Sequence, residues 1–147
     1  MSYVAPDTDA YMGEVVGDGQ CVAYVKAAAS CPATSQWAEG SKVRDSGIAT
    51  GTAIATFQDG KYNNYTDGRS HAAIFISQDG DGLVVHDQWL GQAVHERTIR
   101  FKGGSGKPVN DGDAFSVIEN AAALRAIAKF RRRQAGTKQN VKKRSTR

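Results

Sequence analysis

The sequence of 147 residues is poor in the residues that staple small secreted proteins or cross membranes. It has two cysteines, Cys21 and Cys31, which are too few for a disulfide framework. On one continuous helix they would lie about 15 Å apart, beyond the span of a disulfide, and only a break near Pro32 would allow a bridge. No apolar run approaches the roughly 18 residues that a transmembrane helix needs, so none is predicted.

The N-terminus lacks the features of a secretory signal peptide. Residues 1–10 include two aspartates but no basic cluster and no apolar stretch. If the protein acts outside the cytoplasm, we therefore expect another route to carry it there. Three prolines against sixteen glycines, with 40% hydrophobic residues, predict one folded domain with many tight turns between short strands.

The net charge of +4 conceals an asymmetry between two parts of the chain. Residues 125–147 contain ten of the nineteen basic residues and no acidic one, so residues 1–124 carry nine basic and fifteen acidic residues, a net charge of −6. We predict a folded domain over residues 1–124 and a basic tail, helical and then disordered, over residues 125–147. Such a tail attracts nucleic acid, anionic lipid or anionic wall polymers, or it is simply solvated.

The hydrophobic pattern predicts a helix followed by strands, which is an α+β architecture. Residues 20–30 are rich in alanine and place apolar residues at helical spacing, whereas residues 35–47 form a polar connection. A second helix is predicted over residues 119–133, with disorder beyond Gln134. Residues with high β-propensity predict about five antiparallel strands, at 52–57, 72–77, 83–88, 93–101 and 113–118.

Cys21 is the strongest candidate for a nucleophile. It falls in the first turn of the predicted helix, directly after the glycine-containing turn of residues 17–19. The unpaired N–H groups and the positive dipole end of a helix lower the pKa of a thiol at this place. Cys31 lies at the other end of the same helix, where the dipole raises the pKa of a thiol. A cysteine on a helix is otherwise most often a small core residue.

His71 and Asp87 are the candidates for the base and for the group that orients it. His71 opens a predicted strand, and Asp87 ends the strand that pairs with it, so the two positions lie nearly opposite each other. A carboxylate there fixes the imidazole tautomer while the imidazole takes the thiol proton. His86 faces the other side of the sheet, although a register slip of one residue would exchange its role with that of Asp87. We interpret His95 as a surface or structural residue.

Metal and phosphate sites are not predicted. The histidines and cysteines lack the close spacing of a zinc site such as CxxC or HExxH, so we expect no metal and no cofactor. The glycine-rich segment 103–107, GGSGK, lacks the full phosphate-loop pattern, and we interpret it as a connection between strands.

Three segments together resemble a known superfamily of cysteine hydrolases. Gly19-Gln20-Cys21 followed by VAYVK resembles the nucleophile motif of the CHAP group within the CHAP and NlpC/P60 superfamily. His71 followed by AAIFI resembles its histidine strand, and Asp87 occupies the place of its third polar residue. With TAIATF before the histidine, the combination is most similar to small amidase effectors that bacteria deliver by type VI secretion.

The resemblance implies a papain-like fold, in which the cysteine helix packs on the antiparallel sheet. It implies a peptidoglycan amidase or endopeptidase that is secreted without a signal peptide, acts in the periplasm of a target bacterium and is neutralised by a cognate immunity protein. It also implies an oxyanion hole formed by the Gln20 side chain and the Cys21 backbone N–H. The groove walls are expected among large aromatic residues that could equally be core, namely Trp37, Tyr62, Tyr65 and Trp89. The basic tail departs from the family pattern.

Two other functions remain open at this stage. The first is a hydrolase-like binding module whose tail holds nucleic acid or an anionic surface, which the ten cations after residue 124 suggest. The second is a transamidase or deamidase that acts on proteins, because the same Cys-His-Asp set serves those reactions.

Overall fold

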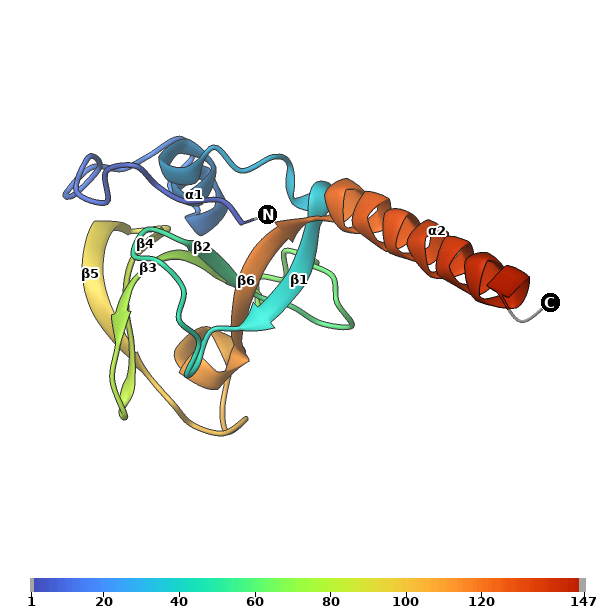
Figure 1. Ribbon diagram of the computed structural model, residues 1–147. Coiled ribbons are helices and arrows are strands. Elements are labelled where there is room, and N and C mark those ends of the chain that lie inside the picture. Colours follow the sequence, from blue (N-terminus) through green and yellow to red (C-terminus); the bar gives the residue numbers. More distant parts are fainter. Residues whose placement is uncertain (1, 146–147) are drawn as a thin grey trace.

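The computed structural model describes the backbone of residues 2–145 and the side chains of residues 2–135. Figure 1 shows a body formed by one sheet with a short helix beside it, and a long second helix that projects from the body. The elements in chain order are α1 (Cys21–Ala29), β1 (Trp37–Lys42), β2 (Ala53–Thr56), β3 (Ala72–Gln78), β4 (Gly82–Trp89), β5 (Gln92–Arg100), β6 (Phe115–Asn120) and α2 (Ala121–Ser145).

The six strands form one antiparallel sheet in the order β1-β6-β2-β3-β4-β5. The predicted α+β class is confirmed, but the prediction of about five strands misses β1. That strand begins at Trp37, inside the segment expected to be a polar connection. It lies at the edge of the sheet and only its first residue is buried, so its sequence WAEGSK lacks the run of β-forming residues that marks an inner strand.

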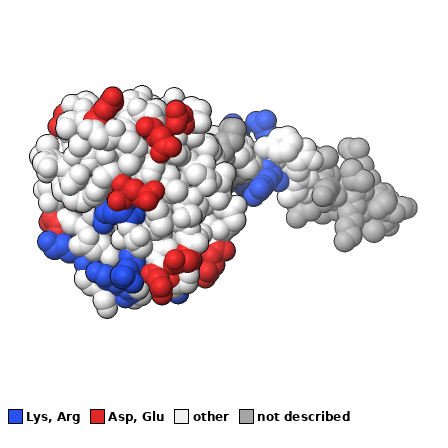
Figure 2. Space-filling model, turned by 90° about the vertical axis from the view of Figure 1, so that its left-hand side faces the viewer, with Lys and Arg blue, Asp and Glu red and all other residues white. Residues whose placement is uncertain are grey.

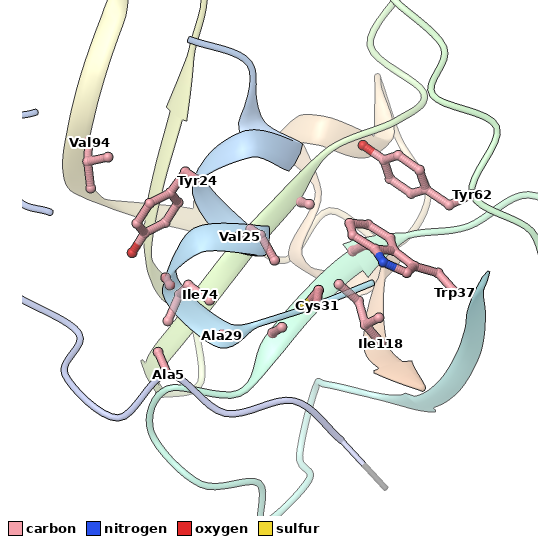
Figure 3. Close-up of a cluster of buried hydrophobic side chains, with 14 residues drawn as sticks. Ala5, Tyr24, Val25, Ala29, Cys31, Trp37, Tyr62, Ile74, Val94 and Ile118 are labelled. Atoms are coloured by element: carbon pink, nitrogen blue, oxygen red, sulfur yellow. The ribbon is translucent and has the colours of Figure 1, made fainter. Parts of the chain in front are cut away.

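The core has one cluster of apolar side chains on each face of the sheet. On one face, Tyr24 and Val25 of α1 are fully buried against strand residues that include Ile74 and Ile118, as Figure 3 shows. The cluster on the other face uses the alternate residues of the same strands, and it consists of Val43, Ile54, Ala73, Phe75, Leu83, Val85, Ile99, Phe115 and Val117. Because β3 and β4 are buried on both faces, their positions in the sheet are well defined. His71 directly precedes β3, and Asp87 lies near the end of β4.

The helix α2 begins where β6 ends. Asn120 caps it, because its Oδ1 accepts a hydrogen bond of 2.9 Å from the backbone N–H of Ala123. The helix continues to Ser145, past the end predicted near Gln134, because Ala, Lys, Arg and Gln favour a helix even where no apolar periodicity signals packing. The disorder predicted for residues 146–147 lies outside the described residues. Neither described helix is long and apolar enough to span a bilayer.

Candidate active site

Cys21 is the first residue of α1, as the glycine turn predicts. Gly19 before it has a φ of 85°, a left-handed conformation that favours glycine, and Asp18 Oδ1 accepts a 3.0 Å hydrogen bond from the N–H of Gln20. Gln20 stands at the N-cap position, but no side chain caps the helix. The thiol therefore lies beside helix N–H groups that no capping side chain occupies.

His71 and Asp87 are in contact, as expected from the hairpin. His71 directly precedes β3, and its backbone N–H donates to Thr56 Oγ1 at 3.0 Å, which fixes the start of the strand. Its Nε2 lies 2.7 Å from Oδ2 of Asp87, and both side chains are buried. Because Asp87 occupies Nε2, the other ring nitrogen, Nδ1, is the one that remains for the thiol of Cys21.

The strand register differs from the predicted one. β3 and β4 pair Ile74 with His86, which shifts Asp87 toward Ala73 instead of His71. The contact still forms because His71 and Ala73 are two residues apart and point to the same face. His86 faces the other way, as predicted: its Nδ1 contacts the carbonyl oxygen of Thr8 at 2.9 Å, and its Nε2 lies 3.1 Å from Glu96.

Two residues of β5 complete the surroundings of Asp87, and the sequence did not identify either as part of the site. Arg97 Nε donates to Oδ2 at 2.7 Å, the same oxygen that contacts His71. His95 Nε2 lies 3.1 Å from Oδ1 without the geometry of a hydrogen bond, a position compatible with the surface or structural role predicted for it. His95 and Arg97 are two residues apart on one face of β5, and the β4–β5 register, with Asp87 opposite His95, brings that face to the carboxylate.

The electrostatics favour a thiolate beside an imidazolium. Burial opposes ionisation of the Cys21 thiol, but interactions with His71, with the backbone of Ala72 and with the hydroxyl of Tyr62 together outweigh burial and lower the pKa of Cys21. Burial would also lower the pKa of His71, yet hydrogen bonds and charges from Asp87 and Cys21 raise it to about 9. The pKa of Asp87 stays below its ordinary value despite burial, because His71 and Arg97 stabilise the carboxylate. This pattern is typical of an activated cysteine.

The thiol opens onto a cleft of about 560 Å³. Of the predicted contact residues, Gln20, Tyr65 and Trp89 line it. The indole of Trp89 stands edge-on to His71, with ring centroids 6.4 Å apart. The other residues of the wall come from α1 and the turn before it, from the loop before β3 and from the turn after β4, and they include Asp18, Val22, Lys26, Asn64, Thr66, Ser70 and Leu90.

Trp37 does not line this cleft, which corrects its predicted role. It is buried in the core, where its ring lies 4.8 Å from that of Tyr62 and its Nε1 donates to the carbonyl oxygen of Pro32 at 2.9 Å (Figure 3). Tyr62 is buried as well, but its hydroxyl lies 3.7 Å from Cys21 Sγ. A large aromatic in a strand packs where the neighbouring strands allow, and the sequence does not specify which face that is.

Gln88 is a further residue with a role at the site. Its side chain is fully buried and makes three hydrogen bonds to the segment before Cys21. Its Oε1 accepts from the N–H of Val16 at 2.9 Å, and its Nε2 donates to the carbonyl oxygens of Val16 and Gln20 at 2.8 and 2.7 Å. It therefore fixes the turn that presents Cys21.

The second thiol lies outside this chemistry. Cys31 is free and buried, and burial raises the pKa of its thiol to about 12. Cys21 is free as well. Within the described residues, no group of three or more His, Cys, Asp or Glu side chains has the arrangement of a metal site.

Comparison with known proteins gives consistent matches. Residues 2–118 match the family model for domesticated amidase effector 2. A type VI secretion amidase effector 2 protein of Salmonella typhi is 31% identical over an alignment of 134 residues, and the match covers 81% of this chain and 100% of that protein. Domesticated amidase effector 2 of Ixodes scapularis is 41% identical over an alignment of 107 residues, and the match covers 68% of this chain and 70% of the relative. The solved structure of type 6 secretion amidase effector 2 (Tae2) matches with a TM-score of 0.69 and 32% identity, over 80% of this chain and 94% of that one.

Proposed function

The chain belongs to the domesticated amidase effector 2 family, and from that premise we propose that it hydrolyses an amide bond of bacterial peptidoglycan with Cys21 as the nucleophile. The observation that supports a cysteine mechanism is that Cys21 and His71 line the same cleft, where Asp87 contacts His71 at 2.7 Å. The names of the relatives support an amide as the substrate. Membership of the CHAP and NlpC/P60 superfamily and a papain-like fold remain predictions.

In the first half of the reaction, the thiolate of Cys21 attacks the carbonyl carbon of the amide and forms a C–S bond. The carbonyl oxygen becomes an oxyanion, which the backbone N–H of Cys21 and the side chain of Gln20 stabilise. His71 then gives its Nδ1 proton to the leaving nitrogen, the C–N bond breaks and the amine departs. The product on the enzyme is a thioester.

In the second half, a water molecule replaces the amine. His71, now neutral, takes a proton from the water molecule while the water oxygen attacks the thioester carbon. The C–S bond breaks, the carboxylic acid leaves, and the thiolate–imidazolium pair is restored. Throughout, Asp87 holds Nε2–H, so the ring keeps the orientation that both steps need.

Delivery and inhibition are part of the same proposal. The relatives named as type VI secretion effectors support secretion of this chain and action on target bacteria, with the periplasm as the compartment where peptidoglycan is reached. A cognate immunity protein would act by covering the 560 Å³ cleft at Cys21 and Trp89.

Release of new amine ends from purified sacculi tests the proposal. Cys21→Ala should reduce the rate at least about a thousandfold, and His71→Ala should reduce it nearly as much. Cys31→Ala is the matched control, because it removes a thiol outside the cleft and should keep the activity. Full activity of Cys21→Ala would refute the mechanism.

Mass spectrometry of the soluble fragments identifies the bond and the reaction. Hydrolysis adds water to the carbonyl side of the broken amide. A transamidase would instead join an added primary amine to that carbonyl, so digestion in the presence of such an amine separates the two reactions. Intact sacculi after digestion with wild-type protein would argue against peptidoglycan as the substrate.

A further inference from the structure

The helix α2 lies outside the part of the chain that the family model matches, which ends at residue 118. Residues 125–147 carry ten cations and no acidic residue, whereas residues 1–124 carry a net charge of −6. We propose that α2 is an electrostatic arm that holds the protein on the carboxylate-bearing peptidoglycan network. This inference rests on the proposed function, because it takes peptidoglycan as the substrate.

The cations at the start of α2 are available to a partner. Arg125, Lys129, Arg131 and Arg132 are all exposed. Within residues 2–135, none of these four side chains forms an ion pair. Figure 2 shows basic side chains where the helix leaves the body, and on the visible face of the body it shows scattered acidic side chains together with a group of basic ones.

The placement of α2 leaves the cleft free. The helix follows β6, which lies next to the edge strand β1, whereas the catalytic Asp87 lies on β4 toward the opposite edge of the sheet. Twenty-five residues of helix extend about 37 Å, and Figure 1 shows that α2 points away from the body. A polymer bound along α2 would therefore raise the local concentration of substrate at the cleft without occupying it.

A carboxylate-bearing polymer fits these observations better than a lipid bilayer or a nucleic acid. The acidic body repels any polyanion, and a basic arm offsets that repulsion toward an anionic substrate. Among the described side chains of α2, Phe130 is the only large apolar one that is well exposed, with 62% of its surface accessible. One such residue provides neither the apolar face that inserts into a bilayer nor the row of aromatics that stacks on bases.

Sedimentation with sacculi tests the arm, with Cys21→Ala as the background so that the polymer stays intact. One variant changes Arg125, Lys129, Arg131 and Arg132 to Gln. The matched control changes Lys42, Lys61, Arg100 and Lys102 to Gln, all exposed on the body, so both variants have the same net charge of zero. We expect the helix variant to bind at least about tenfold more weakly than the control at about 50 mM salt, and the difference to shrink at about 200 mM salt.

Active versions of the same variants separate this inference from the proposed function. On sacculi, the helix variant should show a raised KM, and on a soluble stem-peptide fragment its kcat/KM should equal that of the control. Equal binding of the two variants to sacculi at every salt concentration would overturn the proposal that α2 is an electrostatic arm. The proposal would also be overturned if the helix variant bound more weakly than the control only to phosphatidylglycerol vesicles or duplex DNA. If the wild-type chain released no amine ends from sacculi, the proposed function would be refuted, whatever the sedimentation result.

Discussion

Arg97→Gln tests how the buried carboxylate of Asp87 is held. Arg97 Nε and His71 Nε2 each lie 2.7 Å from the same oxygen of that carboxylate, whose side chain is 0% exposed while that of Arg97 is 19% exposed. Removal of one partner from a buried ion pair costs about 3–5 kcal/mol of unfolding free energy. Because His71 and His95 remain near Asp87, we expect a loss of about 2 kcal/mol at neutral pH.

The loss should depend on pH in a defined direction. In the folded protein the pKa of Asp87 is lowered. The ionised carboxylate therefore stabilises the fold at a pH above the pKa of Asp87 in the unfolded chain, about 3.9, and this stabilisation disappears as the pH falls through the pKa of Asp87 in the folded protein. Without Arg97 the pKa of Asp87 in the folded protein rises, so the ionised carboxylate stabilises the fold less. The gap in unfolding free energy between wild type and Arg97→Gln should therefore be largest near pH 7 and should narrow as the solution is made acid.

Urea unfolding of a double-mutant cycle isolates the contact. Asp87→Asn removes the carboxylate that Arg97 neutralises, so Arg97→Gln should cost much less in that background, with a coupling energy of about 1–2 kcal/mol. Arg97→Lys, which restores the charge without the planar guanidinium, should recover part of the stability and of kcat/KM. A coupling below about 0.5 kcal/mol would refute the assignment of Arg97 as the group that holds Asp87 ionised.

Three further predictions follow from the site. Iodoacetamide at neutral pH should alkylate Cys21 and leave Cys31 unmodified in the folded protein, because the pKa of Cys21 is lowered and that of the buried Cys31 is raised to about 12. Peptide mass spectrometry measures the alkylation of each cysteine. The kcat/KM on a soluble substrate should fall above about pH 9, where His71 loses the proton that it gives to the leaving amine, and a profile flat through that pH would contradict the ion pair. Gln88→Ala should lower the unfolding free energy by about 2–3 kcal/mol in urea titrations and also reduce kcat, since three buried hydrogen bonds to the turn before Cys21 are lost.

The parts of the site that the sequence identified depend on local patterns. Cys21 follows a glycine turn and begins a helix, and both features are visible within about ten residues. His71 and Asp87 flank a hairpin whose short turn brings the ends of its strands together. Even a register error of two residues left the contact intact, because residues two apart share a face.

The parts that the sequence missed depend on contacts between distant strands. The strand β1 is an edge strand without apolar alternation, and only its pairing with β6 defines it. Trp37 and Trp89 are equally plausible cleft residues by type, yet the first lies in the core and the second on the cleft wall. Which side of the sheet an aromatic faces follows from strand pairing, which residue types alone do not specify.

Arg97 belongs to the second group, and yet the chemistry requires it as much as it requires Asp87. A carboxylate with no exposed surface and no cationic partner would take up a proton, because burial favours its neutral form. A neutral Asp87 could not stabilise the imidazolium of His71, and without that positive charge the Cys21 thiol would lose one of the interactions that lower its pKa against burial. In the proposed mechanism, Arg97 therefore acts on Cys21 through two intermediate groups while it reaches neither the thiol nor the leaving amine. The reactive residues of this site can be read from local sequence patterns, whereas the charge that keeps them reactive comes from the pairing of β4 with β5.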